Sequence, residues 1–302
     1  MVEENFALKN AYRDYLLVER GLEENTVAQY LTEMQKFMQW LQAEYKLEQV
    51  ETEKVTIAQI RRYISYLKNE RDNKPATRNV KVSVLKSYYQ FLVLTEYLEE
   101  EDNPALYIRK AKEAKPLPVY LTLEESQALL QASLVNTSMP ERDYAMMRFF
   151  LTTACRMAEF LGFGLDNWDL EDNAVRLLGK GNKERIIPLT SKTRAALEEY
   201  MQVRKPYMEK ERIVFLNDRG TPISANTVRR IFKKICRDAG LIKPGLSPIK
   251  LRHTCLTLLL KEGVDLVVLK EIAGHESIQT TRRYTHITQN DLRRAVKKFP
   301  LG

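Results

Sequence analysis

Histidine and arginine gather near the end of this sequence. All three histidines lie in the final fifth of the chain, interleaved with arginines in LRHT, AGHE and RRYTHI; they are His253, His275 and His286. Guanidinium groups can hold phosphate oxygens with planar, paired hydrogen bonds. Taken alone, the histidines remain open to a structural or incidental role. Metal ligation is disfavoured because neither HExxH nor matched Cys/His spacing occurs.

Basic charge is concentrated in the same region. The 302-residue chain has a net charge of +8. Residues 241–302 contain eleven Lys or Arg against five Asp or Glu, a balance of +6 that leaves +2 for the preceding part of the chain. This distribution favours a polyanionic partner such as DNA, although a solvated helical face would explain the same charges.

The composition is that of a globular protein, with 44% hydrophobic and 29% charged residues. No apolar run approaches the roughly 18 residues that a membrane span needs, so we expect no membrane partner. The N-terminus lacks a basic stretch followed by an apolar core, and no secretory signal is predicted. Three cysteines without CxxC spacing argue against a disulfide framework or zinc knuckle. We therefore expect a cytoplasmic protein.

Residues 1–100 are predicted to form a helical domain. Apolar residues recur there at three- and four-residue steps in four segments, namely residues 6–20, 26–45, 57–69 and 76–96. The exposed face of the last segment offers Arg78, Lys81 and Lys86 for contacts with DNA phosphates. The neighbouring Tyr88 and Tyr89 are expected in the core.

A linker is predicted at residues 101–120, because this stretch lacks clear periodicity and contains three prolines. Thr122 and Glu125 then form a capping-box pattern that starts a helix and, with it, a second domain over residues 121–302.

The second domain is predicted to be mostly helical, with one small β element. The segments AVRLL and ERIIPL flank GKGNK within residues 174–189, which is typical of a β-hairpin with a glycine-rich turn. Residues 213–216 are predicted to add a third short strand.

The C-terminal segment resembles the second motif box of tyrosine recombinases, especially the Xer and phage-integrase branch. That family has an arginine in a helix, a Gly-His pair some twenty residues later, and then a tyrosine followed by Thr-His. Here these positions are taken by Arg252, Gly274, His275 and Tyr284.

Two further matches precede this box in the family's order. LTTACRMAEFLGFGLDNWDL is similar to the first box, with Arg156 followed three residues later by Glu159. Lys180 in GKGNKERIIPL matches the hairpin lysine of the Xer branch. Because the N-terminal helices also resemble the family's core-binding (SAM-like) domain, the resemblance covers nearly the whole chain.

The resemblance implies transfer of a DNA strand to a tyrosine without metal or cofactor. Arg156 and Arg252 would hold the non-bridging oxygens of the five-coordinate phosphorus. Tyr284 would be the nucleophile, in a basic setting that includes Arg282 and Arg283, because a phenol with a pKa of about 10 attacks poorly until its charge is stabilised.

Other residues would assist the same reaction. Lys180 would protonate the leaving 5′ oxygen, and no nucleotide is expected because GKGNK does not satisfy the P-loop pattern. His275 would donate to the phosphate, with a structural role as the alternative. Glu159 and His253 would support the site.

One position departs from the family pattern. Ile249 stands where the family has a histidine, three residues before Arg252, and isoleucine can neither donate nor accept a proton. His253 follows Arg252 directly and would point about 100° away from it on a helix. Loss of one acid–base group costs about 10²- to 10⁴-fold in rate, so the resemblance predicts a slow but competent enzyme.

The implied architecture is a mainly α, two-domain, C-shaped clamp around double-stranded DNA carrying a specific core site. Four protomers would form the synapse, possibly with a related partner recombinase, and the tail at residues 287–302 would pack on the neighbouring protomer. Two other readings stay open: a type IB topoisomerase, and a catalytically slowed or inactive DNA-binding relative, to which Ile249 lends weight.

Overall fold

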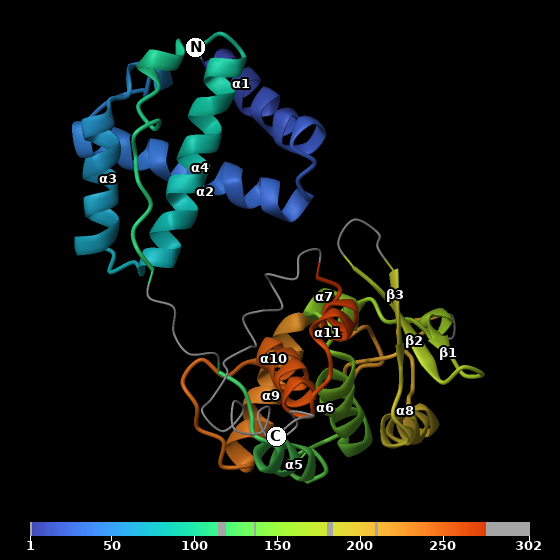
Figure 1. Ribbon diagram of the computed structural model, residues 1–302. Coiled ribbons are helices and arrows are strands. Elements are labelled where there is room, and N and C mark those ends of the chain that lie inside the picture. The colour runs from blue at the N-terminus through green and yellow to red at the C-terminus, as the bar shows by residue number, and fades with distance from the viewer. Residues whose placement is uncertain (1, 114–118, 136, 180–183, 209–210, 276–302) are drawn as a thin grey trace, which may run out of the picture. The chain divides into compact units, whose positions relative to one another are not determined.

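The computed structural model consists of two compact units, residues 1–116 and 117–302 (Figure 1). It describes residues 2–113, 119–135, 137–179, 184–208 and 211–275, with side chains from residue 8 onward. Helices dominate both units, and each unit has its own hydrophobic core. The predicted fold class, two mostly helical domains with a small sheet in the second, is confirmed.

The first unit contains the four predicted helices: α1 (Val2–Asp14), continued by a π-helix (Tyr15–Glu19), α2 (Glu24–Tyr45), α3 (Ile57–Asn69) and α4 (Pro75–Leu94). Aromatic side chains fill the core between them, with Phe37 and Trp40 packed on Tyr63. Tyr88 and Tyr89 are buried there, as expected. Such rings bury large apolar areas, which stabilises a small domain.

After α4 and a short 3-10 helix (Glu100–Asp102), the chain packs back along the first unit before it reaches the second. Ala105 and Ile108 are buried in the first core. The amide of Asn79 on α4 bonds both backbone groups of Ala111, at 2.8 and 2.9 Å. A side-chain amide that pairs with both groups of one residue fixes that residue as a strand neighbour would.

The second unit begins with α5 (Leu123–Ala132), where Thr122 and Glu125 form the predicted capping box. The remaining helices are α6 (Pro140–Thr153), α7 (Met157–Leu161), α8 (Ser191–Val203), α9 (Ala225–Asp238), α10 (Pro248–Lys261) and α11 (Leu266–Ala273). Phenylalanines from α6, α7 and the following segments stack in the main core. Among the described residues, no helix is long and apolar enough to cross a membrane.

A three-stranded antiparallel sheet lies in the second unit, in the order β1 (Trp168–Asp169), β2 (Ala174–Leu178), β3 (Glu184–Pro188). The β2–β3 hairpin is the predicted one, with Val175 opposite Ile187. The prediction of a third strand at residues 213–216 is wrong. Ile213 makes only an isolated bridge to Gly164, and β1 is the third strand instead. A two-residue strand is too short to show alternation in sequence.

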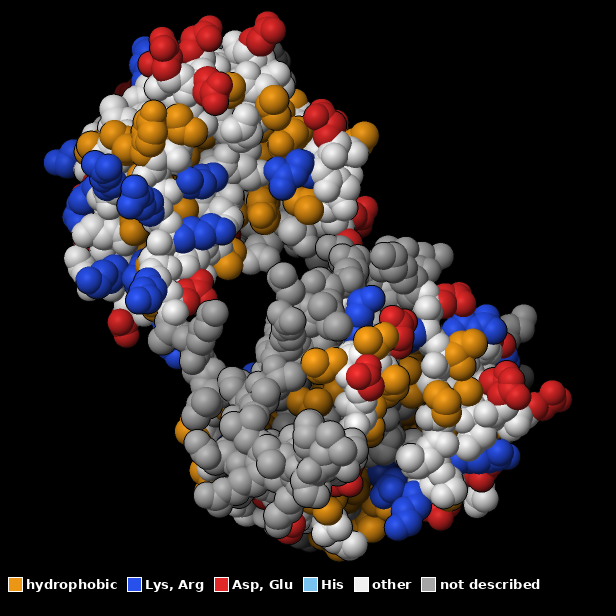
Figure 2. Space-filling model, in the orientation of Figure 1, with side chains coloured by type: hydrophobic (Ala, Val, Ile, Leu, Met, Phe, Trp, Pro, Cys, Tyr) orange, Lys and Arg blue, Asp and Glu red, His pale blue; other side chains and the backbone are white. Residues whose placement is uncertain are grey.

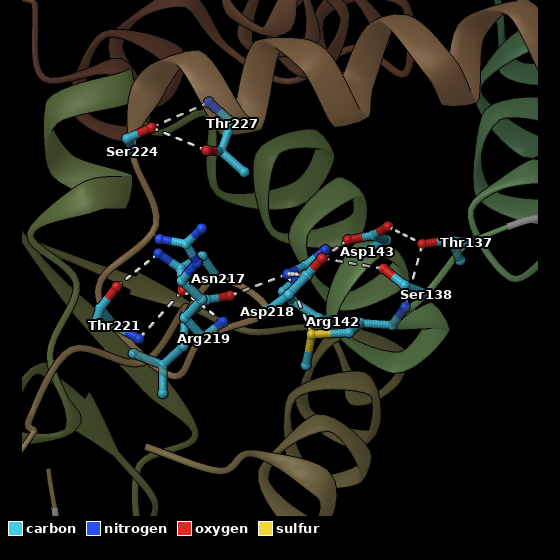
Figure 3. A network of polar contacts seen from close by, with 12 residues as sticks. Thr137, Ser138, Arg142, Asp143, Asn217, Asp218, Arg219, Thr221, Ser224 and Thr227 are labelled. Atoms are coloured by element: carbon cyan, nitrogen blue, oxygen red, sulfur yellow. Dashed lines mark hydrogen bonds and ion pairs between the residues drawn. The ribbon is translucent and has the colours of Figure 1, made fainter. Parts of the chain in front are cut away.

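A buried ion-pair network ties α6 to the turn that precedes α9 (Figure 3). Arg142 donates from Nε to Asp143 (2.9 Å) and from Nη1 to Asp218 (2.7 Å), and the side chains of Arg142 and Asp143 are each 2% exposed. The hydroxyl of Thr137 donates to the same Asp143 carboxylate. Because a buried charge is costly without partners, this network fixes the turn from which α9 starts.

Candidate active site

Three arginines, distant in sequence, donate to three successive carbonyls at the C-terminal end of α11. Arg185 Nε bonds the carbonyl of Ile272 (3.0 Å), Arg252 Nη2 that of Ala273, and Arg156 Nη2 that of Gly274 (2.9 Å). A helix C-terminus leaves carbonyls without helical partners and carries partial negative charge, so it attracts cations. In Figure 1, α7 and α11 lie side by side near β3, which carries Arg185.

Gly274 shapes the end of α11. Its φ of 57° is in the left-handed region, which closes the helix as a C-cap. A Cβ at this position would lie 3.2 Å from Cδ and Nη1 of Arg185. Glycine therefore permits both the turn and the close approach of the arginine.

Arg156 is oriented by Glu159, one turn further along α7. The Arg156 backbone N–H bonds Oε2 of Glu159 (2.6 Å), and Nη1 bonds Oε1 (2.8 Å). The Glu159 side chain is 2% exposed, whereas that of Arg156 is 37% exposed. Burial alone would raise the pKa of Glu159, but hydrogen bonds from Arg185 and Arg156 outweigh it and lower the pKa to about 2. The carboxylate stays ionised, and the outer part of Arg156 faces solvent.

Arg252 is held from the other side. It is 5% exposed and donates from Nη1 to the carbonyl of Ala154, the left-handed residue (φ 50°) that ends α6. Ala154 also belongs to a small apolar cluster with Cys255, Leu256, Leu269 and Ala273, which joins the end of α6 to α10 and α11. This cluster fixes the spacing between the segments that carry Arg156 and Arg252.

The cysteines near this cluster have thiols of low reactivity. Burial raises the pKa of Cys155 and of Cys255 to about 12, so both thiols remain protonated at neutral pH. All three cysteines are buried and unpaired with one another.

His275 follows the glycine cap and lies against Arg252, with Nε2 3.0 Å from Nη2. A guanidinium has no acceptor, so the imidazole accepts through Nε2 and carries its proton on Nδ1. The structure thus brings Arg156, Glu159, Arg252 and His275 together around one helix end.

Ile249 and His253 share α10 with Arg252. Ile249 lies one turn before Arg252 and is 55% exposed. His253 is half-buried beside Arg252. Near the start of α10 the chain therefore has an exposed aliphatic side chain where the family resemblance implies a histidine.

Several predicted site residues lie outside the described part of the chain. They are Lys180, Arg282, Arg283, Tyr284 and the tail at residues 287–302. In the sequence, Lys180 lies between β2 and β3, and Tyr284 follows nine residues after His275. Among the described residues, no group of His, Cys, Asp and Glu could hold a metal ion.

The three DNA-binding candidates on α4 make contacts within the first unit. Lys81 is paired with Glu33 and its side chain is 12% exposed. Arg78 donates to the carbonyl of Asn73, and Lys86 to that of Leu106 (3.2 Å). Lys86 also lines a surface pocket of about 680 Å³ with Arg61, Arg109 and the 73% exposed Tyr107.

Sequence reasoning missed two features of the second unit. One is Arg185, whose role depends on contacts with residues far along the chain. The other is α9, which carries a row of exposed basic residues: Arg229, Arg230, Lys233, Lys234 and Arg237. They line a pocket of about 890 Å³ together with the loop at residues 241–248 that leads into α10. Counting charged residues along α9 alone would have revealed its basic row. The net charge summed over residues 1–240 did not, because acidic residues elsewhere in that range offset it.

The fold and the arginine cluster define a mostly helical, two-unit protein whose second unit gathers three arginines at the end of one helix. Comparison with known families identifies it further. The model of the phage integrase family matches residues 119–291, and that of the phage integrase N-terminal SAM-like domain matches residues 10–96. The chain belongs to the phage integrase family and is a tyrosine-type site-specific DNA recombinase.

Curated relatives agree with this assignment. The chain is 36% identical to a tyrosine recombinase XerC of Caldanaerobacter subterraneus over 83% of its own length and 70% of the relative's. It is 34% identical to a tyrosine recombinase XerD of Chlorobaculum tepidum, covering 95% and 94% of the two chains.

Solved structures share the fold at lower identity. The Tn1549 transposon integrase in complex with circular intermediate DNA matches with a TM-score of 0.74 at 18% identity, over 96% of this chain and 98% of that one. The XerH recombinase bound to its difH substrate matches with a TM-score of 0.72 at 22% identity, over 90% and 79%.

Proposed function

We propose that this chain cleaves and rejoins DNA strands at a specific core site through a 3′-phosphotyrosyl link to Tyr284, within a tetrameric synapse. The convergence of Arg156, Arg252 and His275 at the end of α11 is the observation that supports the proposal most directly. Integration, excision and dimer resolution all use this chemistry.

The two arginines have complementary roles at the phosphate. Arg252 is nearly buried and bonded to two carbonyls, so its guanidinium is fixed before DNA arrives. Arg156 is the more exposed of the pair and reaches the phosphate oxygens first. Cations that are already oriented stabilise a five-coordinate phosphorus without reorganising during the reaction. His275, whose Nε2 accepts from Arg252, offers its Nδ1–H as a further donor, and Lys180 protonates the leaving oxygen.

DNA is bound along two basic surfaces, one in each unit. In the second unit it is the exposed row on α9, whose pocket extends to Ser247 and Pro248 at the start of α10. In the first unit it is the pocket of Arg61, Lys86 and Arg109. Figure 2 shows Lys and Arg side chains gathered over this face of the first unit, around α3 and the segment at residues 106–109. Tyr107 offers a ring beside these cations.

The two units would form a C-shaped clamp around the duplex, which fits a chain with two basic surfaces and a linker between them. In this proposal four copies, or copies with a related recombinase, assemble on DNA in the cytoplasm. The tail at residues 287–302 would contact the neighbouring protomer.

Trapping of the covalent intermediate tests the proposal. The substrate is a nicked suicide duplex whose core site has been selected from a randomised library by binding to the purified chain. A denaturation-resistant adduct that forms with the native chain and is absent with Tyr284→Phe supports the mechanism. An adduct that persists in Tyr284→Phe contradicts it.

A second candidate is favoured by Ile249. If this aliphatic residue marks the loss of catalysis, the chain is a DNA-binding relative that does not cleave. Tight binding of the selected duplex without any adduct would support this candidate over the first.

A further inference from the structure

Arg185 on β3 bonds two separate parts of the site. Its Nη1 and Nη2 donate in parallel to Oε1 and Oε2 of Glu159, each at 2.7 Å. Its Nε donates to the carbonyl of Ile272 at the end of α11. The side chain is only 11% exposed, so these bonds are shielded from water. We propose that Arg185 is a positioning residue for the phosphate clamp, acting through Glu159 on Arg156 and through α11 on His275; this rests on the proposed function.

The argument from charge begins with Glu159. Its carboxylate is shared by two guanidiniums, Arg156 and Arg185, so the three side chains together carry one net positive charge. Without Arg185, Arg156 alone would neutralise a carboxylate that is 2% exposed. The positive charge that Arg156 offers to a phosphate would then be largely cancelled, because charges interact strongly where water is excluded.

The argument from geometry concerns the end of α11. Arg185 and Arg156 bond the carbonyls of Ile272 and Gly274, and both bond Glu159. These contacts link α7, β3 and α11 in one connected set. His275 is the next residue after Gly274, and its ring lies against Arg252. Removing Arg185 therefore loosens the segment on which His275 is placed.

Lysine cannot substitute fully for this arginine. A guanidinium offers a planar fork that matches both carboxylate oxygens and leaves Nε for a third acceptor. An ammonium is a point charge on a flexible chain, so Arg185→Lys would keep the charge but not all three bonds.

The test compares cleavage of two forms of the selected suicide duplex, one with an ordinary scissile phosphate and one with a neutral methylphosphonate. The methylphosphonate lacks one anionic non-bridging oxygen and depends less on the arginine clamp. The variants are Arg185→Met and Arg185→Lys, with Arg156→Ala as reference. Arg176→Met is the matched control, because Arg176 lies on the neighbouring strand with a side chain 53% exposed.

On the ordinary phosphate we expect Arg185→Met to form adduct roughly 10- to 100-fold more slowly, by analogy with the loss of a hydrogen-bond partner that orients a metal ligand. The rate of adduct formation for Arg185→Lys should lie between those of Arg185→Met and the native chain. The DNA affinity of both variants should stay within about threefold of the native affinity. On the methylphosphonate the defect of Arg185→Met should shrink to about threefold, and that of Arg156→Ala should shrink as well. Equal defects on both substrates, or native rates for Arg185→Met, would overturn the proposal.

A second measurement does not depend on cleavage. The side-chain ¹⁵N signals of Arg156, assigned by their loss in Arg156→Lys, should shift in Arg185→Met and Arg185→Lys but not in Arg176→Met. Unchanged Arg156 signals would overturn the positioning role. If the native chain forms no adduct on either duplex while these signals do shift, the proposed function fails and the positioning of Arg156 by Arg185 stands.

Discussion

Arg185 donates two parallel hydrogen bonds of 2.7 Å to the carboxylate of Glu159, whose side chain is 2% exposed. Burial would raise the pKa of Glu159, but the bonds from Arg185 and Arg156 lower it from the ordinary 4.5 to about 2. A carboxyl whose pKa is lowered in the folded state stabilises the fold above its unfolded pKa and loses that contribution as pH falls through its folded pKa. This pair therefore stabilises the fold above about pH 4.5, and the contribution is lost towards pH 2.

Glu159→Gln should show this dependence. The pKa shift of Glu159 corresponds to about 3 kcal/mol. The free energy of unfolding at pH 7 should therefore be lower for the variant than for the native chain, by on the order of 3 kcal/mol. The difference should narrow as pH falls from 4.5 towards 2, because the native carboxyl becomes protonated and resembles the amide. Urea denaturation of both proteins across this range measures the difference. A gap that stays constant with pH would contradict the assignment.

Gly274→Ala should impair both stability and cleavage. Forcing alanine into the left-handed region costs about 1 kcal/mol, and the added Cβ would press on Arg185 at 3.2 Å. Gly263→Ala is the control, because Gly263 has a φ of 88° but nothing within 4 Å of its Cβ position. We expect a larger loss of unfolding free energy for Gly274→Ala than for Gly263→Ala, with slower adduct formation only in the former. Equal losses would mean that Arg185 moves aside freely.

Arg142→Met should destabilise the second unit by about 3–5 kcal/mol, because it leaves the buried Asp143 carboxylate without its counter-charge. Loss of the counter-charge costs less at Asp218, because its side chain is 57% exposed and water can solvate the carboxylate. The double variant Arg142→Met/Asp143→Leu should recover part of the loss, as an apolar pair avoids the buried charge. Equilibrium unfolding in urea compares the three proteins. A double variant no more stable than the single one would show that the cost lies in packing.

The sequence predicts locally determined features well. The predicted capping box joins Thr122 and Glu125, which are three residues apart, and the predicted hairpin pairs five residues on each strand. The arginine cluster could not be predicted in this way, because Arg156 and Gly274 are 118 residues apart and Arg185 and Glu159 are 26 apart. The family motifs indicated Arg156, Arg252 and His275. The sequence around Arg185 does not indicate that its side chain bonds Glu159 and α11. Periodicity finds elements, whereas side chains that meet between elements are fixed by tertiary packing.

The basic row on α9 predicts a salt-dependent contribution to DNA binding. Arg229 and Lys233 are four residues apart and share one exposed face of the helix. Arg229→Gln and Lys233→Gln should each weaken binding of any duplex and reduce the slope of log affinity against log salt by about one. Lys192→Gln on α8 is the control, because Lys192 is exposed but lies outside the row. Fluorescence anisotropy over a salt series measures the slopes. If the slopes of the two α9 variants equal that of the control, α9 does not contact the DNA.

Ile249→His should speed formation of the covalent adduct. Residue 249 lies one turn before Arg252 on α10 and is 55% exposed, so an imidazole fits there without disturbing the core. A neutral imidazole at this place could accept the proton that the tyrosine hydroxyl loses as it attacks, an effect of about 10²- to 10⁴-fold for a well-placed group. Ile249→Gln is the control, because it adds polarity without a group that titrates near neutral pH. Single-turnover adduct formation on the suicide duplex, followed from pH 5.5 to 8, should show a new titration in the histidine variant alone. If the histidine variant is no faster than the native chain at any pH, the residue at 249 does not limit the rate, and the protons of this reaction are carried elsewhere.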